Sequence, residues 1–261
     1  MYRNKKIYLY LCAIVFSLIS VGFKSETLIA SSKSKAAIAN IEYREFNILQ
    51  YSFENNVVKD AHVIEYKEGF RIIQPLYLKS NKQSLTFNQI ADEFKKLPKV
   101  LAINIKEIEL LDYSNINDKY WEKAHKIKNF RSYASGSDNK ICFYANDHFS
   151  IEKSTKKLFP ALAHEAAHIL DEKISSQKNR MSNSQEWIDI MKFDLAFKKS
   201  GKFTEKYIDY GIYCTEYSRS SSSYVEDFAE AIAQYVTDKE RFIKEYPNRS
   251  IKIEQLFNYK K

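Results

Sequence analysis

Two histidines in a helix-forming stretch constrain this chain most strongly. The segment "ALAHEAAHILDEK" places His164 and His168 four residues apart and puts Glu165 directly after the first. Its four alanines and its lack of glycine favour a helix, and Pro160 is typical of a first helical turn. Because positions i and i+4 lie on one face of a helix, both imidazoles can point at a single ion. The sequence therefore predicts a helix that begins near Pro160 and carries a candidate metal site.

This HExxH pattern is suggestive but not specific. Glu165 projects from an angle next to the two histidines, close enough to act on a water at the metal without being a ligand. A chain with five histidines contains the pattern by chance in roughly one case in 150. A zinc site of this type also needs a third protein ligand, with the fourth position left open for water. The third ligand has to come from elsewhere in the chain.

A downstream segment, "SYVEDFAEAIAQYV", offers an acidic pair at the same helical spacing. Glu226 and Glu230 stand at i and i+4, and Glu226 follows His168 by 58 residues (226 minus 168). That interval has room for an intervening helix, "SQEWIDIMKFDLAFKK", and a loop. Such a pair is ordinarily a solvated helix edge. Here apolar residues alternate with the carboxylates, which indicates that at least one carboxylate points inward and needs a partner.

The first 30 residues have the pattern of an export signal. A basic start, "MYRNKK", precedes an uncharged apolar run at residues 7–23, and a polar flank follows. Cleavage after Gly22 or after Ala30 fits the pattern. An uncleaved anchor is the alternative, since 17 apolar residues (23 minus 6) lie at the lower limit for crossing a bilayer. We expect a secreted, extracellular protein with no stable membrane association after signal cleavage.

Composition and charge describe a folded, basic protein. With 44% hydrophobic and 28% charged residues, the chain is not expected to be disordered. The net charge of +8 falls to +5 without residues 1–30, which carry four basic residues and one acidic residue (8 minus 3). Anionic surface polymers, acidic substrates or a solvated surface fit this charge. Nucleic acid is not an expected partner, because no compact Lys/Arg block accompanies it.

Two cysteines remain outside the expected signal. Cys142 and Cys214 could form one disulfide, which an oxidising exterior permits. They could equally be two buried free thiols, because sequence spacing does not establish the distance between them. Both alternatives stay open at this point.

Secondary-structure patterns change from β-rich to helical along the chain. Strands are expected within residues 46–53, 62–66, 71–78, 100–113 and 140–147, and helices within residues 87–97, 118–127 and most of the chain after residue 154. This order indicates an α+β fold. We divide the chain into a signal peptide (1–30), a β-rich segment (31–84) and a main domain (85–261). Ser220–Ser223 is expected to be a mobile loop, with an active-site lid as the alternative. Trp121 and Trp187 are interpreted as packing residues and not as part of a substrate cleft.

The two motifs together resemble those of the anthrax lethal factor-like protease domain family, which includes the secreted Pro-Pro endopeptidases. "HEAAHILD" followed by "EDFAEAIAQY" is similar to that family's motif pair, and the resemblance covers roughly residues 85–257. It implies a zincin-like metalloprotease domain with a small β-sheet and a mainly helical C-terminal part that carries the zinc site. It also implies a zinc endopeptidase of the gluzincin type, with one Zn²⁺ per chain. A monomer that cuts proteins or peptides, with proline-rich sites as candidates, is the expectation.

Carried over residue by residue, the resemblance implies roles for five metal-site residues. These are the zinc ligands His164, His168 and Glu226, the catalytic base Glu165, and Glu230, which orients a ligand histidine. The family's oxyanion-stabilising tyrosine stands seven residues before the glutamate ligand, where this chain has Arg219 (226 minus 7). Tyr217, nine residues before the ligand (226 minus 217), is assigned that role, with Tyr213 and Tyr224 as alternatives.

Two other classes of function compete with the protease. A non-catalytic zinc-binding surface or adhesion module with the same fold is the main alternative, although such a site does not need the base Glu165. A membrane-tethered structural protein is the other, and the N-terminus of the mature chain would distinguish it. Asp171, one turn after His168, either orients a ligand or is a surface charge.

Overall fold

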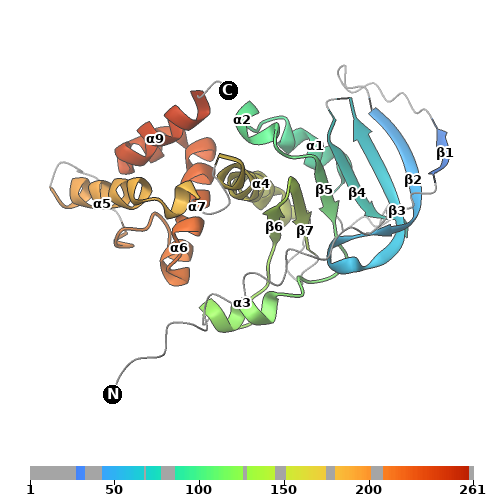
Figure 1. Ribbon diagram of the computed structural model, residues 1–261, viewed down its shortest axis with the longest axis horizontal. Coiled ribbons are helices and arrows are strands. Elements are labelled where there is room, and N and C mark those ends of the chain that lie inside the picture. The colour runs from blue at the N-terminus through green and yellow to red at the C-terminus, as the bar shows by residue number, and fades with distance from the viewer. Residues whose placement is uncertain are drawn as a thin grey trace.

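A seven-stranded sheet with helices packed on one of its faces forms the fold in a computed structural model (Figure 1). The structure describes residues 28–32, 43–67, 69–77, 86–125, 128–144, 151–174, 180–200 and 208–258. The strands are β1 (Leu28–Ser32), β2 (Tyr43–Ser52), β3 (Val58–Tyr66), β4 (Arg71–Pro75), β5 (Glu107–Leu110), β6 (Ala134–Ser137) and β7 (Lys140–Phe143). The α-helices are α1 (Phe87–Phe94), α2 (Lys99–Ala102), α3 (Asp118–His125), α4 (Ile151–Ile174), α5 (Gln185–Lys199), α6 (Glu216–Ser221), α7 (Tyr224–Thr237), α8 (Lys239–Glu245) and α9 (Pro247–Asn258), and short 3₁₀ helices are η1 (Glu54–Asn56) and η3 (Met181–Asn183). This mixture of sheet and helix is compatible with the expected α+β class.

The strand order is β1-β2-β3-β4-β5-β7-β6. The pairs β1–β2, β2–β3 and β3–β4 are antiparallel, whereas β4–β5 and β5–β7 are parallel. Parallel neighbours need long crossover connections, and here these connections contain α1 and α2 or α3. Strand β6 is antiparallel to β7 and stands at the end of the order. Within the described residues its other edge has no strand partner, so backbone groups there are available to a ligand.

The main core lies between the sheet and helices α1, α4 and α7. On β5, Ile108 and Leu110 face this core, and the alternate residues Glu107 and Glu109 lie on the opposite face, as strand geometry requires. Helix α4 contributes fully buried alanines and leucines on several turns, and α7 packs against it. Helix α4 therefore has the sheet on one side and α7 on another, so its position is fixed by packing (Figure 1).

Helix α4 is longer than the sequence predicted. It begins at Ile151, and Pro160 lies inside it instead of in its first turn, so that expectation was wrong. An internal proline removes one backbone hydrogen bond and costs about 3 kcal/mol. Leu158 and Leu162 flank Pro160 and are fully buried. Burial of such a side chain contributes about 1.5–3 kcal/mol, so the two together offset the proline.

Two other segments differ from the predicted elements. Residues 100–113 were expected to be a strand, but they begin within helix α2 and only then form β5. Pro98 supplies the extended residue from which the α2 turn starts. Strand β6 was not predicted, because its sequence "ASGS" has no alternation of apolar and polar residues. Three of these four residues, those at positions 134–136, border the candidate site.

The structure describes little of the first expected segment and joins the other two through one sheet. The expected signal peptide lies outside the described residues except for Leu28–Ala30, which belong to β1. The β-rich segment and the main domain share one sheet, because β4 pairs with β5. In the part of the chain that the structure describes, no helix is both long and apolar enough to cross a membrane.

The two cysteines are free thiols, which decides between the alternatives left open by the sequence. Cys142 and Cys214 are both buried, and they lie in different hydrophobic clusters on opposite faces of the sheet. Burial raises the pKa of both thiols, so each is a neutral group at ordinary pH. They act as small core residues.

Candidate active site

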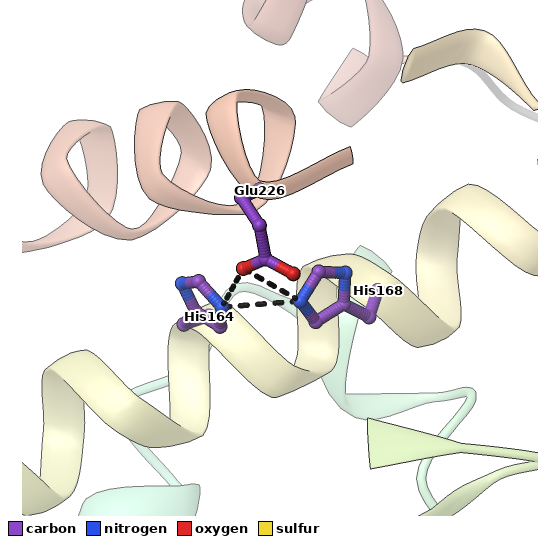
Figure 2. A group of neighbouring side chains, drawn as sticks. All are labelled: His164, His168 and Glu226. Atoms are coloured by element: carbon purple, nitrogen blue, oxygen red, sulfur yellow. Dashed lines mark hydrogen bonds and ion pairs between the residues drawn. The ribbon is translucent and has the colours of Figure 1, made fainter. Parts of the chain in front are cut away.

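Helices α4 and α7 bring three metal-ligand side chains to one point. His164 and His168 rise from consecutive turns of α4, and Glu226 descends from the first turn of α7 between them (Figure 2). Their Nε2 atoms lie 3.1 Å apart. The Glu226 Oε2 atom lies 3.2 Å from the first imidazole nitrogen and 3.6 Å from the second. The residues predicted as ligands are thus brought together.

These distances fit a single bound cation. Ligand atoms about 2.0–2.2 Å from a tetrahedral zinc ion stand about 3.3 Å from one another. Glu226 Oε2 is buried and receives no well-oriented hydrogen bond, even though both imidazoles are close to it. Burial by itself would raise the pKa of Glu226, but the two histidines hold it well below its usual value. Two imidazoles and an ionised carboxylate are a donor set that zinc accepts.

Ser223 fixes the position of Glu226. Its hydroxyl caps α7 by accepting a hydrogen bond from the Glu226 backbone N–H at 3.2 Å. Ser222 adopts a left-handed conformation with φ of 51° and ends α6. The serine run was expected to be a loop, and this holds only for Ser222 and Ser223, which connect the two helices, because Ser220 and Ser221 belong to α6. A cap of this kind typically stabilises a helix by about 1 kcal/mol.

The remaining two carboxylates of the motifs surround the same centre. Glu230 Oε1 lies 3.0 Å from His164 Nδ1, the ring nitrogen that faces away from the other ligands. Glu165 is 8% exposed and lines the cleft beside the histidines. Burial raises the pKa of Glu165 despite the opposing effect of the histidines. A carboxylate with a raised pKa is better suited to take up and return a proton near neutral pH.

Asp171 has neither of the two positions considered for it. It is fully buried, and its carboxylate accepts hydrogen bonds from the backbone N–H and hydroxyl of Ser182 at 3.1 and 2.6 Å. It therefore ties the end of α4 to η3, which leads into α5. Its role in the structure is to anchor this connection.

Of the three tyrosines considered for the oxyanion role, Tyr217 is the one that lines the cleft. Its ring centroid lies 6.2 Å from that of His164. The alternatives, Tyr213 and Tyr224, stack on each other and do not line the cleft. Arg219, at the position of the family tyrosine, is exposed and pairs with Glu216. Burial, followed by the nearby carboxylates of Glu226 and Glu165, raises the pKa of Tyr217, so its hydroxyl keeps its proton.

A cleft of about 470 Å³ opens above these residues. Its floor is α4 and α7, and β6, α3 and α6 form its sides. The side-chain lining beyond the metal site includes Trp121, Phe130, Arg131, Tyr133 and Gln234. Trp187 is a core residue as expected, but Trp121 lines the cleft, so its interpretation as a packing residue was wrong.

Gly136 lets β6 lie directly against the motif. A β-carbon at this position would stand 2.6 Å from the backbone oxygen of Glu165 and 2.9 Å from its Cβ. Only a residue without a side chain allows this approach. An isolated glycine in a strand was the one signal in the sequence that could have pointed to this contact.

A buried ionic network holds the far side of α7. Arg249 from α9 is 1% exposed and pairs with Asp194 of α5 at 3.0 Å and Asp227 of α7 at 3.1 Å. Asp227, next to the candidate ligand, also accepts a hydrogen bond from the Cys214 backbone N–H at 2.7 Å. The network thereby joins the segment that leads into α6 to helix α7. Helix α6 carries Tyr217, and α7 carries Glu226.

A second group of ligand-type side chains lies on the opposite face of the sheet, and one of its carboxylates is already paired with a lysine. Glu54, Glu109 and Cys142 place ligand-type atoms within 4.8 Å of one another. However, Lys140 Nζ lies 2.6 Å from Glu109, and the Tyr51 hydroxyl donates to the same carboxylate at 2.9 Å. The thiol keeps its proton because burial raises its pKa. Glu109 therefore already has a cation from the protein, and the protonated thiol is a poor metal ligand.

The sequence comparisons agree with the chemistry of the cleft. A comparison with curated proteins finds no match to this chain. Residues 113–256 match the family Peptidase_Mx1, described as "Putative zinc-binding metallo-peptidase". The match spans 144 of the 261 residues (256 minus 112) and includes both histidines, Glu165, Tyr217 and Glu226. The chain therefore belongs to this family of zinc-binding metallo-peptidases.

Proposed function

We propose that the protein is a zinc-dependent endopeptidase of the HExxH, gluzincin type with a zincin-like fold. The observation that carries this proposal is the convergence of two imidazoles and one buried, unbonded carboxylate oxygen beside Glu165, on the floor of an open cleft. Kinship with the lethal factor-like proteases is part of the proposal and is supported by the motif pair. Secretion is supported by the export-type N-terminal sequence. Proline-rich cut sites are supported by the resemblance alone.

Each cleft residue has a distinct task in peptide hydrolysis. A zinc ion held by His164, His168 and Glu226 would polarise the scissile carbonyl and make water a stronger nucleophile. Glu165 takes a proton from the attacking water and delivers it to the leaving amine. The protonated hydroxyl of Tyr217 donates a hydrogen bond to the oxygen on which negative charge develops. Glu230 holds the His164 ring through its Nδ1 atom.

The edge of β6 suits an extended polypeptide substrate. Residues 134–136 of β6 line the cleft, and β6 pairs on its other side with β7. A peptide can add to such an edge as a further strand through main-chain hydrogen bonds. Gly136 keeps this edge close to Glu165, so a peptide paired with β6 would pass next to the base.

A single substitution with a matched control tests the proposal. The chain from Ser31 to Lys261 is prepared as wild type, as Glu165→Gln, and as Glu240→Gln, which makes the same change at an exposed site on α8. Bound zinc is measured by elemental analysis, and cuts in a peptide library are read by mass spectrometry. We expect about one zinc per chain in all three proteins, with cleavage roughly 10²–10⁴-fold slower in Glu165→Gln alone.

The other outcomes separate the alternatives. Zinc in every protein without cleavage by the wild type would favour the non-catalytic binding module. Absence of zinc from the wild type would show that the ligand assignment is wrong. Equal cleavage by the wild type and Glu165→Gln would refute the role of Glu165 as base.

A further inference from the structure

The ionisable side chains that line the cleft differ in how they are used. His164, His168, Glu165, Glu226, Glu230 and Tyr217 all belong to the candidate metal site. Arg131 is the one lysine or arginine among the lining residues that the structure describes, and it has no part in that site. It follows α3 and stands three residues before β6 begins. The candidate metal site therefore does not account for a positive charge at this position of the cleft.

Arg131 also differs from the other arginines that the structure describes. Those arginines each pair with a carboxylate within 3.2 Å: Arg44, Arg71, Arg180, Arg219, Arg241 and Arg249. Arg131 has no carboxylate within ion-pair distance in the described part of the chain, and its guanidinium donates to the backbone oxygen of Phe130 at 2.8 Å. A guanidinium has five N–H donors, so most of its bonding capacity is available to a ligand.

The backbone around Arg131 is anchored. The backbone N–H and hydroxyl of Ser132 donate to the same oxygen of Asp118 at 2.9 and 2.7 Å. Asp118 is 4% exposed and begins α3. The bond of Arg131 to Phe130 holds the guanidinium toward its own turn. Arg131 is exposed and lines the cleft from an anchored stretch of backbone, so its guanidinium is accessible to a ligand there.

We propose, on the basis of the proposed endopeptidase function, that Arg131 forms a subsite for a carboxylate of the peptide substrate. Guanidinium groups bind carboxylates through two parallel hydrogen bonds, and no other ionic partner competes for this one among the described residues. The carboxylate is either an acidic side chain or the C-terminal carboxylate of the substrate. The protein would then select peptides by a negative charge at a set distance from the cut.

That distance follows from the strand. Arg131 precedes Gly136, the residue against Glu165, by five positions (136 minus 131), so the two Cα atoms lie at most roughly 17 Å apart. A bound strand rises about 3.4 Å per residue, which places the carboxylate within about five residues of the scissile bond. A substrate antiparallel to β6 runs from its Ser137 end toward its Ala134 end. In that orientation Arg131 reads residues on the C-terminal side of the cut.

The test uses peptides that differ by one charge. Starting from a sequence that the wild type cuts, glutamate, glutamine or lysine is placed at each of five positions on either side of the bond, with the C-terminus as free acid or amide. The proteins are wild type, Arg131→Gln, Arg131→Glu, and Arg241→Gln, which removes the same charge from α8 outside the cleft. We expect the wild type to prefer glutamate or the free acid about tenfold in kcat/KM at one position.

The expected pattern across variants is specific. Arg131→Gln should lose the preference, Arg131→Glu should favour lysine at that position, and Arg241→Gln should keep the wild-type preference. A position-dependent effect of glutamate identifies an acidic side chain as the ligand, and an effect of the free acid alone identifies the C-terminal carboxylate. A preference that survives in Arg131→Gln, or that is equally lost in Arg241→Gln, would overturn the proposal.

A binding measurement separates this inference from the proposed function. Fluorescence anisotropy with labelled peptides of the library is measured on the Glu165→Gln protein with and without Arg131→Gln. If the wild type cuts no peptide, the endopeptidase proposal fails. The carboxylate subsite would still be supported by tighter binding of glutamate peptides that depends on Arg131, and it would be refuted by binding that ignores this residue.

Discussion

Replacing Gly136 by alanine is the sharpest test of how β6 and the HExxH helix form one site. The backbone at Gly136 is not in the left-handed region, so alanine imposes no conformational strain there and its effect is steric. The new β-carbon would stand 2.6 Å from the Glu165 backbone oxygen, and ordinary contact begins at 3.4 Å. The strand and the helix must therefore separate by about 0.8 Å (3.4 minus 2.6). Strand β6 is the element expected to move, because α4 is packed on several sides.

The magnitude follows from that displacement. Overpacking of this kind costs about 1–3 kcal/mol of folding free energy. A misplacement of about 1 Å near the reacting groups can lower catalysis by roughly 10²-fold. We expect kcat/KM for a cleaved peptide to fall about 10- to 100-fold while zinc content stays the same, because the three ligands come from α4 and α7.

The assay combines peptide cleavage, zinc analysis and urea unfolding. Ser137→Thr is the matched control, since it also adds a methyl group to β6 but at an exposed position. A Gly136→Ala protein that is folded, holds zinc and cuts as fast as the wild type would refute the idea that β6 positions the substrate. Loss of zinc would instead show that the displacement falls on α4.

Three further predictions concern single side chains. Tyr217→Phe should lower kcat roughly 10²-fold with zinc affinity unchanged, as measured by steady-state kinetics and chelator competition, because only the hydrogen bond to the developing negative charge is removed. Glu230→Gln should weaken zinc binding about 10- to 100-fold in the same competition, because the ionic contact with His164 Nδ1 is lost. Lys140→Met should cost about 3–5 kcal/mol at pH 7 in urea unfolding, because it removes the cation that pairs with buried Glu109 and one of the two cations that pair with Glu107. Burial raises the pKa of Glu107, but Lys140 and Arg71 lower it to about 2. Because this pKa is lowered in the folded protein, the stability that Glu107 contributes to the wild type should be present above its unfolded pKa of about 4.3 and be lost as the pH falls toward 2. The difference in free energy of unfolding between the wild type and Lys140→Met should therefore become smaller in acid.

The local parts of the site could be predicted from the sequence because they depend on helix periodicity. His164 and His168 share a face at any i,i+4 spacing in a helix, and the apolar positions around Glu226 indicated that its helix buries one side. The convergence of the two helices was expected from the motif pair. The distances of 3.2 and 3.6 Å between Glu226 and the histidines show that convergence.

The walls of the cleft could not be predicted, because they depend on contacts between distant segments. Strand β6 has small polar residues and no hydrophobic pattern, so nothing local marks it as a strand. Arg131 and Trp121 look like ordinary surface residues until β6 and α3 are placed beside α4. The start of α4 was predicted wrongly for a related reason. Local rules place proline in the first turn of a helix, whereas tertiary packing stabilises α4 on both sides of Pro160.

The buried arginine of α9 sets an order of events for folding. Ribosomes make the chain from its N-terminus, so α4 and α7 exist before Arg249 does. Until Arg249 arrives, Asp194 and Asp227 are two carboxylates in a closing core without their cation, and leaving such a charge unpaired costs about 3–5 kcal/mol. We therefore expect a chain shortened before α9 to pack α7, the helix that carries Glu226, less firmly. The last helix that the structure describes would in this way support the candidate site without touching any of its ligands.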